Sequence, residues 1–404
     1  MKAATRNADQ ANPLKLTWAQ RLIFNNLRSL SGAHLSIIDS GNTRNFGDEH
    51  SNLKAVIKVN HSRFYSDLVL GGTIGAGESF MAGDWETPDL TAVIQVMAKN
   101  LGVTSKFDAG LAKLIKPLNK FYHWRNRNSE RQARNNIARH YDLGNDFFQT
   151  FLDPTMSYSA APFANGETTM EQASLAKFAA MAEQLELKAE DTLVEIGTGW
   201  GGFAIYAAEQ IGCHVTTTTI SEEQHAYTKA LIEERGLAEK ITLLKDDYRA
   251  LHGKFDKLAS IEMIEAVGWQ YLDTYFGTLK RLLKPGGKAV IQAITIPEDR
   301  YESAKNDVDF IQKYIFPGGF LPSVSAISTH AGSQGLYLSN YYDFGLGYAE
   351  TLACWRKRFE ENLSEIKPQG LSDTFINMWR FYFSYCEGGF REQKIGVGHF
   401  TFTN

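Results

Sequence analysis

The sequence predicts an α/β protein whose larger part is a doubly wound, mostly parallel sheet, preceded by a small α+β domain. Helix and strand patterns alternate from about residue 170 onward, as they do in such sheets. A short apolar strand at 193–196 runs into closely spaced glycines and then into a helix pattern at 203–209. The 404 residues are also enough for two domains of ordinary size.

The N-terminal elements are short and mixed. Apolar residues at helical spacing predict an amphipathic helix over 17–30, and β-branched runs predict strands at 35–38 and 55–59. The glycine-rich stretch 71–85 follows no buried strand, so we interpret it as turns and close packing rather than as a phosphate-binding loop. These elements predict an α+β domain over residues 1–105.

The remaining elements define the second and larger part of the chain, residues 140–404. We expect a helix at 174–187 and five strands, at 193–196, 214–219, 241–244, 257–262 and 289–296. Ligands in doubly wound sheets bind at the carboxyl ends of the strands. The segments expected there are the glycine loop, 219–224, 246–248 and 262–265.

The glycine loop is the first candidate binding site. Bare backbone at the start of a helix lets amide groups approach a ligand closely, and Glu195 adds a carboxylate beside the opening. A tight turn without a ligand is the alternative, but the number of glycines and Glu195 favour a nucleotide-like cofactor. The spacing differs from Gly-x-Gly-x-x-Gly, so NAD is not the first choice. The glycines are Gly197, Gly199, Gly201 and Gly202.

Composition excludes several classes of function. The net charge of −4 gives no general reason to expect nucleic acid as a partner. The 3 cysteines form no CxxC pair, which argues against a disulfide framework and a structural zinc, and we predict no metal site. No run reaches the roughly 18 apolar residues of a membrane span, and residues 1–30 do not resemble a signal peptide. We therefore expect a cytoplasmic protein.

Residues 106–139 form a basic and aromatic linker. A solvated helical linker is one interpretation; a patch that contacts an anionic membrane, with aromatic anchors, is the sharper one. Nucleic acid is the least favoured partner, because the chain is acidic and shows no nucleic-acid module. The basic residues are Lys113, Lys116, Lys120, Arg125, Arg127, Arg131, Arg134 and Arg139, and the rings are Phe121, Tyr122 and Trp124.

Nine ordered stretches carry a resemblance to a known family. They are HYDLGNDFF (140–148), LDPTMSYS (152–159), VEIGTGWGGFA (194–204), TISEEQ (219–224), IEMIEAVG (261–268), AITIPEDRY (293–301), FIQKYIFPGGFLPS (310–323), YAETLACW (348–355) and YCEGGFRE (385–392). The chain thus resembles the cyclopropane-fatty-acyl-phospholipid synthases, including their mycolic acid and plant relatives. GESFMAGDW (77–85) is similar to their N-terminal domain.

The resemblance implies the seven-stranded Rossmann-like fold of class I S-adenosylmethionine (SAM) methyltransferases and transfer of a methylene group from SAM. The acceptor would be the cis double bond of an acyl chain in a membrane phospholipid, at the inner face of the membrane. Three alternatives remain: a methyltransferase that gives a methyl-branched chain, a small-molecule methyltransferase, and a lipid-binding protein with a degenerate site. A homodimer would let two openings face one bilayer.

The cofactor predicted for the glycine loop is SAM. Threonines stand where an acid usually binds ribose, so Ser221 or Gln224 would take over that role, while Asp247 would accept from adenine and Tyr248 would stack on it. The full predicted set is Tyr158, Ser159, Glu195, Gly197, Gly199, Trp200, Gly201, Thr219, Ser221, Gln224, Asp247 and Tyr248.

The predicted catalytic residues surround a base. The resemblance implies a bicarbonate ion as that base, and Glu265, the backbone of Ile294, and Tyr348 match the positions that hold it. Two positions depart from the family: Ala160 stands for a cysteine and Gln292 for a histidine. We also include Tyr141 and, because it matches a cysteine once regarded as the nucleophile, Cys386.

Overall fold

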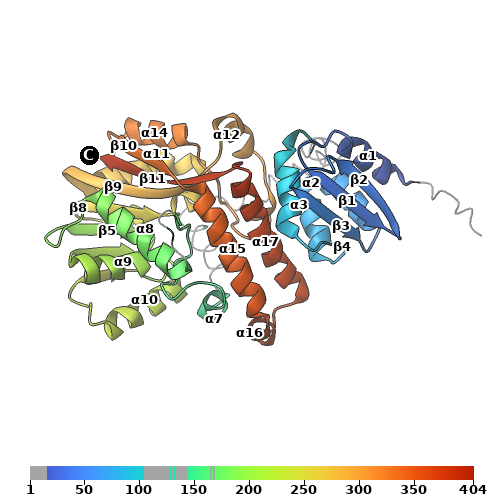
Figure 1. Cartoon of the computed structure of the whole chain (residues 1–404). Coiled ribbons are helices and arrows are strands. Elements are labelled where there is room, and N and C mark those ends of the chain that lie inside the picture. Colours follow the sequence, from blue (N-terminus) through green and yellow to red (C-terminus); the bar gives the residue numbers. More distant parts are fainter. Residues whose placement is uncertain are drawn as a thin grey trace, which may run out of the picture.

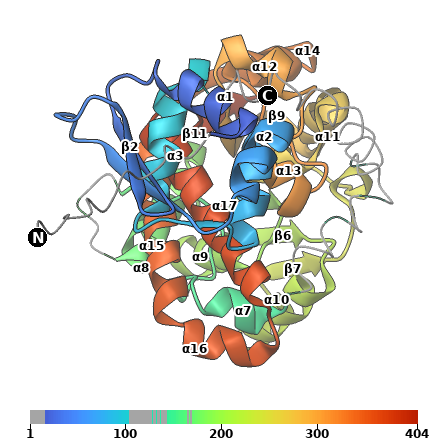
Figure 2. The same ribbon diagram turned by 90° about the vertical axis from the view of Figure 1, so that its right-hand side faces the viewer.

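The structure is a computed structural model that describes residues 16–103, 128, 132, 136, 143–163, 166 and 169–404. It contains two separate sheets, one in each part of the chain. In Figure 1 the N-terminal part lies at one end of the molecule and the catalytic part at the other, with the long helices α15 (Gly345–Glu361) and α17 (Asp373–Arg391) between them. Figure 2, turned by a right angle, shows α17 directly behind the N-terminal elements.

The N-terminal part is a four-stranded sheet with the order β2-β1-β3-β4. Every second residue of these strands, for example Leu35, Ile37 and Ile57, has a buried apolar side chain. The core therefore lies between one face of the sheet and its helices. The helix and strands predicted at 17–30, 35–38 and 55–59 are confirmed. The elements are α1 (Trp18–Leu27), β1 (His34–Asp39), β2 (Asn42–Gly47), β3 (Lys54–Val59), α2 (Arg63–Met81), β4 (Trp85–Glu86) and α3 (Leu90–Lys99).

The interpretation of 71–85 as turns is wrong, because most of this stretch belongs to α2. The helix accommodates its glycines through a kink at Gly72, whose φ of 59° and ψ of −139° are not helical. The expected close packing is present. A Cβ on Gly77 would lie 2.6 Å from the ring of Phe310, so glycine lets α2 approach the catalytic part.

The large sheet has seven strands in the order β10-β11-β9-β8-β5-β6-β7, which confirms the predicted fold class. The strands β9, β8, β5, β6 and β7 are parallel to one another, whereas β11 is antiparallel to both of its neighbours. All five predicted strands are found. The strands are β5 (Thr192–Ile196), β6 (His214–Thr218), β7 (Ile241–Leu244), β8 (Phe255–Ile261), β9 (Leu283–Thr295), β10 (Tyr337–Asp343) and β11 (Gly396–Thr403).

Helices cover both faces of this sheet, because consecutive strand residues point to opposite sides. Leu193 packs with α8 (Met170–Leu185), α9 (Gly202–Tyr206) and α10 (Glu222–Glu234), whereas Val194 packs with α11 (Leu272–Leu282) and α14 (Val324–Ser333). The remaining helical segments are α7 (Asn145–Gln149), η2 (Ala207–Ile211), η3 (Tyr248–Ala250), η4 (Ile264–Ala266), η5 (Trp269–Tyr271), α12 (Glu298–Ala304), α13 (Phe310–Tyr314), α16 (Leu363–Ile366) and η6 (Lys367–Gln369).

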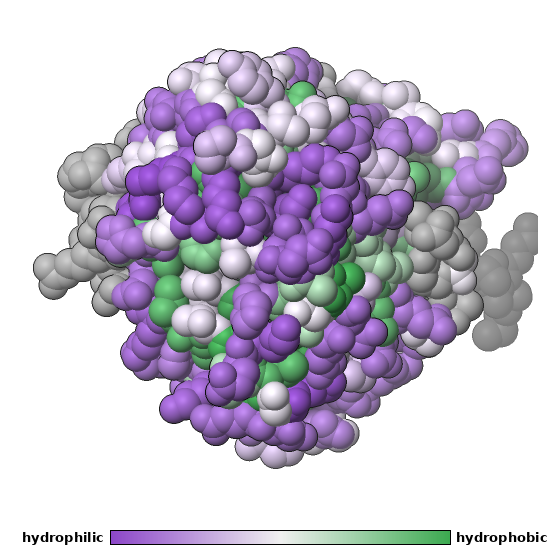
Figure 3. All heavy atoms as spheres, turned by 90° about the vertical axis from the view of Figure 1, so that its left-hand side faces the viewer, coloured by the Kyte–Doolittle hydropathy of each residue, from purple (hydrophilic) through white to green (hydrophobic). Residues whose placement is uncertain are grey.

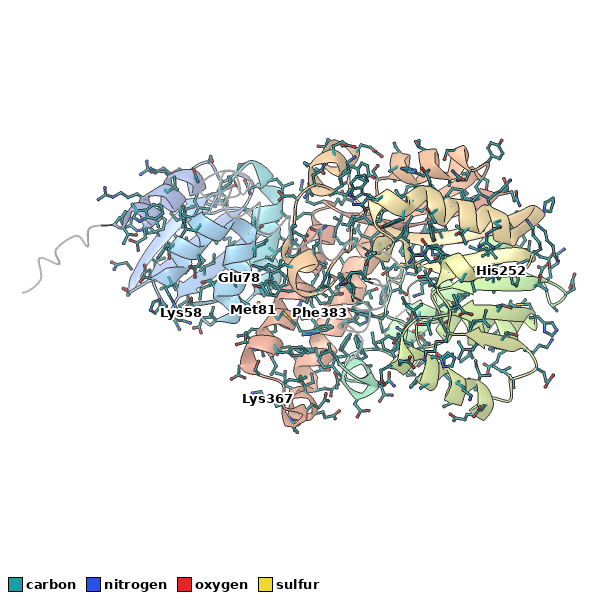
Figure 4. All side chains as sticks on the ribbon, turned by 180° about the vertical axis from the view of Figure 1, so that it is seen from behind. Lys58, Glu78, Met81, His252, Lys367 and Phe383 are labelled. Atoms are coloured by element: carbon teal, nitrogen blue, oxygen red, sulfur yellow. The ribbon has the colours of Figure 1, made fainter. Side chains whose placement is uncertain are left out.

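Polar bonds and close apolar contacts fix the junction between the two parts. The buried Glu387 of α17 accepts from Thr91 of α3 at 3.1 Å and also pairs with Arg356 and Arg391. Glu78 of α2 accepts from Lys313 and Tyr314 of α13, each at 2.5 Å. Figure 4 shows Glu78 and Met81 on the side of α2 that faces α17 and Phe383.

The outer surface of the catalytic part is mainly polar. Figure 3 shows hydrophilic side chains over most of the face opposite the N-terminal part, with apolar ones in recesses across its middle. Within the described residues, no helix is both long and apolar enough to cross a bilayer.

Candidate active site

One cavity of about 720 Å³ lies at the carboxyl ends of β5, β6 and β8 and extends to the N-terminal part. It collects most of the residues predicted from sequence, although they come from segments far apart in the chain. The predicted residues that line it are Tyr158, Ser159, Glu195, Gly197, Gly199, Trp200, Thr219, Gln224, Asp247, Tyr248, Glu265, Ile294, Tyr348 and Cys386.

Three predicted residues lie just outside this lining, and one cannot be placed. Gly201 begins α9, where a Cβ would lie 2.8 Å from Thr228, and Ser221 caps α10 by accepting from the backbone of Gln224. Gln292 is fully buried behind the cavity wall. Tyr141 and the basic residues of 106–139 lie outside the described residues.

The glycine loop is held open for a ligand. The amides of Gly197 and Thr198 both donate to the carbonyl of Thr218, which joins the loop to the end of β6. Gly199 has a left-handed φ of 54°, and a Cβ there would meet no heavy atom within 4 Å. Glycine at this position therefore leaves bare backbone next to open space, as the binding of a nucleotide-like cofactor requires.

Polar side chains around the loop complete this half of the cavity. Glu195 is buried at the end of β5, accepts from Thr217 at 2.6 Å, and has a pKa raised by burial to about 8. The hydroxyl of Thr219 donates to Gln224 at 2.9 Å. Both carboxylate oxygens of Asp247 accept from Arg249, at 2.8 and 2.7 Å, which fixes that side chain at the cavity edge. These groups place hydrogen-bond donors and acceptors beside the open space at the glycine loop.

Aromatic rings also form part of the cavity wall. Tyr158 donates to the hydroxyl of Tyr382 at 2.9 Å, and its ring lies 5.1 Å from that of Trp355 and 6.4 Å from that of Phe316. Trp200 donates to Asn145 of α7 at 2.7 Å, which ties the segment before the sheet to the loop. Aromatic faces stabilise cationic centres, so this wall suits a sulfonium or a carbocation.

Glu262 is a carboxylate of the cavity that accepts three hydrogen bonds. Its Oε1 accepts from the backbone amide of Ala160 and from the Gln292 amide, each at 2.7 Å, and its Oε2 accepts from the Tyr348 hydroxyl at 3.1 Å. The residue has a left-handed φ of 49°, which non-glycine residues seldom adopt outside turns and functional sites. A backbone strained at this point directs a carboxylate into the cavity directly after β8.

A buried chain of side chains orients the Gln292 amide. His399 on β11 donates from Nε2 to Gln292 Oε1 at 3.0 Å, while its Nδ1 accepts from Gln184 at 3.1 Å. Burial lowers the pKa of His399 to about 3, so the ring is neutral. With its oxygen held by the histidine, Gln292 presents its NH₂ group to Glu262 and to the Ala160 carbonyl.

Glu265 lies next to Glu262, and the negative charge of Glu262 disfavours ionisation of Glu265. Its Oε1 accepts from the backbone amide of Ile294 at 2.5 Å, and its buried Oε2 has no hydrogen-bond partner in the structure. Burial, together with the nearby charge of Glu262, raises the pKa of Glu265 to about 8. Burial also raises the pKa of Glu262, but three donors and Lys177 favour its charged form. At neutral pH the proton therefore resides on Glu265 and the charge on Glu262.

Lys177 supports the loop that carries Ala160. The ammonium group is fully buried and donates to Ser157 at 2.6 Å and Ser159 at 2.7 Å, and burial lowers its pKa to about 8. It thereby fixes the backbone just before the amide that binds Glu262.

Sequence reasoning missed three parts of this arrangement: Glu262, His399 and Lys177. The segment 262–265 was placed at the site, but its role was assigned to Glu265 alone. Two glutamates three residues apart at a strand end could have signalled a carboxyl pair. No pattern in the sequence indicates that His399, in the last strand, reaches Gln292. Among the residues that the structure describes, no group of three or more His, Cys, Asp or Glu could hold a metal ion.

Comparisons with known proteins identify the family of this chain. The model of the mycolic acid cyclopropane synthetase family matches residues 128–400. The chain is 37% identical over 340 residues to tuberculostearic acid methyltransferase UfaA1 of Mycobacterium tuberculosis, covering 82% of this chain and 78% of that protein. It is 33% identical over 352 residues to the cyclopropane-fatty-acyl-phospholipid synthase of Escherichia coli, covering 86% of this chain and 88% of that protein.

Solved structures resemble the catalytic part. The mycolic acid cyclopropane synthase CmaA1 in complex with S-adenosylhomocysteine (SAH) and CTAB superposes with a TM-score of 0.63 at 27% identity, covering 67% of this chain and 98% of that one. Coclaurine N-methyltransferase bound to N-methylheliamine and SAH reaches 0.64 at 16% identity, covering 81% of this chain and 98% of that one, and shows the fold alone. The chain is thus a SAM-dependent enzyme of lipid modification with a class I methyltransferase fold, and it belongs to the mycolic acid cyclopropane synthetase family.

Proposed function

We propose that this enzyme transfers one carbon from SAM to the cis double bond of an acyl chain in a membrane phospholipid and closes it to a cyclopropane ring. The observation that carries the proposal is the anchored carboxylate of Glu262, in a largely apolar cavity that also contains the glycine loop. The similarity to the Escherichia coli phospholipid synthase, which extends into the N-terminal part, supports the phospholipid as substrate.

The cavity provides what alkene alkylation needs. SAM supplies an electrophilic methyl group. An alkene is a weak nucleophile, so the walls contribute by holding it against that methyl group and by excluding water from the cation that forms. The rings of Tyr158, Phe316 and Tyr382 stabilise that carbocation through their faces.

Glu262 then serves as the base. Ring closure requires that the transferred methyl group lose a proton, after which the electrons of its C–H bond form the second new C–C bond. The carboxylate of Glu262 accepts from Ala160, Gln292 and Tyr348, which stand at three of the positions that the family resemblance assigns to the bicarbonate site. We therefore propose that the carboxylate of Glu262 replaces bicarbonate in this enzyme. Glu265, which holds a proton at neutral pH, adds a neutral donor beside it.

A methylene- or methyl-branched chain is the second candidate product. The similarity to the tuberculostearic acid methyltransferase favours it. If a hydride shifts along the chain before proton loss, the same base removes a proton from the same methyl group and leaves an exocyclic double bond instead of a ring. Both products therefore use one base, and the fate of the cation decides between them.

Expression in a host with unsaturated phospholipids tests the proposal. Cyclopropyl signals at high field in the proton NMR spectrum of the extracted fatty acids, with a mass gain of one CH₂ for the ring, support ring closure. Vinylidene or methyl-branch signals in place of the cyclopropyl signals would show that the second candidate is the product. A chain without any one-carbon gain, although the protein binds SAM in calorimetry, would reject both.

We also propose that residues 1–105 act as a lipid- or membrane-associated domain and that the basic segment 106–139 contacts anionic phospholipid. Neutralising Lys116, Lys120, Arg125 and Arg127 is then expected to weaken binding to anionic vesicles at low salt, where charge attraction is least screened. Unchanged binding would return this segment to the role of a linker. Sedimentation of the intact protein decides whether a homodimer forms.

A further inference from the structure

We propose that the N-terminal part forms the closed end of the acyl-chain cavity, where α2 and α3 hold the methyl end of the lipid chain. This inference rests on the proposed function, because it names where the substrate of that same site extends. It assigns substrate selection to residues more than a hundred positions away in sequence from the catalytic glutamates.

The cavity passes from the catalytic part into the N-terminal part without interruption. Phe316 and Tyr382 line it near the carboxyl pair, Phe381 lines it beside α2, and side chains of α2 and α3 continue the same lining. The N-terminal residues that line it are Ile57, Phe64, Leu68, Gly71, Thr73, Ile74, Ala76, Glu78, Trp85, Val93, Ile94, Met97, Ala98 and Leu101.

The chemistry of this end suits hydrocarbon. Thr73 and Glu78 are its polar side chains among the described residues, and Glu78 is engaged by Lys313 and Tyr314. Among the described residues, the positively charged side chains of the lining come from the catalytic part, for example Arg300 and Lys394. A phosphate would therefore find no cationic partner among the described lining residues of α2 and α3, whereas a terminal methyl group needs no polar partner.

The end is closed by the core of the N-terminal part. Ile57, Phe64, Trp85 and Val93 are each between 2% and 4% exposed, and they form the floor of the cavity as well as the hydrophobic core of this part. Ile74 is 7% exposed but belongs to none of the hydrophobic core clusters, as expected for a side chain that faces open space on one side. A floor of this kind limits how far a chain can enter.

The kink of α2 accounts for this space. Gly72 breaks the helix between Leu68 and Ile74, so the two halves of α2 do not pack as one straight cylinder. Gly77 then brings the second half against Phe310, and Phe310 lies 4.5 Å from Phe381 between ring centroids. The glycines thus join the N-terminal helices to the aromatic wall of the catalytic part.

Photocrosslinking of the intact protein tests the placement without turnover. The probe is a phosphatidylglycerol vesicle whose unsaturated chain carries a diazirine at its methyl end, with a second probe labelled near the carboxyl end. No lysine or arginine lies between Arg63 and Lys99, so trypsin releases α3 and all of α2 except Arg63 as one peptide, 64–99. We expect the methyl-end probe to label this peptide and the carboxyl-end probe to label the catalytic part. Equal labelling of 64–99 by both probes, or none by the methyl-end probe, would reject the proposal.

Selectivity provides the second measurement. Oleoyl and vaccenoyl chains have equal length, but the oleoyl chain extends two methylene groups further beyond its double bond. Ile74→Trp shortens the cavity, so we expect it to lower conversion of oleoyl relative to vaccenoyl phospholipid about tenfold. The matched control is Leu70→Trp on the same helix, where Leu70 is 40% exposed and the ratio is expected to stay unchanged. An unchanged ratio in Ile74→Trp would overturn the inference, whereas no product from any lipid with the unaltered enzyme would reject the proposed function instead.

Discussion

The amide of Gln292 donates to Glu262 across 2.7 Å, and His399 fixes the direction of that amide from behind. The pair links the end of β8 to the middle of β9 and gives the cavity a carboxylate that belongs to the chain itself. A carboxylate with three donors is stabilised in its charged form although it is enclosed. The predictions on catalysis therefore start from a charged Glu262 carboxylate held by its three donors.

Replacement of the proposed base comes first. Glu262→Gln preserves shape but cannot accept the proton, so we expect kcat to fall by about 10²- to 10⁴-fold while SAM affinity stays unchanged. Glu265→Gln is the matched control, because an amide resembles the protonated carboxyl that this residue carries at neutral pH. A smaller loss in Glu262→Gln than in Glu265→Gln, measured on unsaturated phospholipid vesicles, would exchange their roles.

Bicarbonate dependence separates an internal base from a bound one. The unaltered enzyme is expected to keep its rate in buffer freed of carbon dioxide, because Glu262 occupies the anion position. Glu262→Gly vacates that position and leaves its donors in place, so added bicarbonate is expected to restore part of the lost rate. An unaltered enzyme that stops without bicarbonate would show that the ion is still required.

The pH profile follows from the same carboxylate. The base works in its charged form, and burial raises the pKa of Glu262 above the ordinary carboxyl range. Activity is therefore expected to decline, as pH falls, at a higher pH than an exposed glutamate would give. The measurement is kcat/KM from pH 5 to 9 on one lipid. A flat profile down to the ordinary range of carboxyl groups would contradict the assignment.

Glu195 is expected to make stability depend on pH. Its pKa in the folded state is raised to about 8 by burial, so the folded chain holds a proton that the unfolded chain releases near its ordinary pKa. The resulting stability is complete below that ordinary pKa and is lost as pH rises to about 8. Relative to the unaltered protein, Glu195→Gln is expected to gain about 2 to 4 kcal/mol between pH 5 and pH 8. Urea unfolding without SAM at pH 5 and at pH 8 measures this gain. An equal difference in the free energy of unfolding between the two proteins at both pH values would contradict the prediction.

Cys386 is expected to be dispensable for chemistry. It lines the cavity, but burial raises the pKa of its thiol well above the ordinary value, so almost none of the nucleophilic thiolate exists at neutral pH. Cys386→Ala is expected to retain most of the rate and to lose a little stability through the small void it leaves. A rate reduced as strongly as in Glu262→Gln would restore a chemical role for the thiol.

Much of the fold could be predicted because it depends on local pattern. The strands β5, β6 and β7 begin and end within one residue of the predicted bounds, since buried parallel strands are short runs of apolar and β-branched residues between turns. Helix α2 was missed because glycine content outweighs periodicity in a reading of sequence alone. Its stability comes from contacts such as Gly77 against Phe310, which only the folded chain brings together.

The site was predictable as a collection of segments but not as a set of bonds. The glycine loop and the segment 262–265 follow directly from strand ends, and both lie in the cavity. Which glutamate accepts from Tyr348 depends on the left-handed backbone at Glu262, and no sequence pattern states a φ angle. The link from His399 to Gln292 spans 107 residues and arises from the pairing of β11 with β9.

The bonds that Glu387 and Glu78 make across the junction also constrain how a substrate enters. Rotating the N-terminal part away would break the bonds of Thr91 to Glu387 and of Glu78 to Lys313 and Tyr314. It would also expose the apolar contact in which Ile94 fits against Gly388. Separation of the two parts would therefore cost these contacts. We therefore expect a lipid chain to enter while the two parts stay docked.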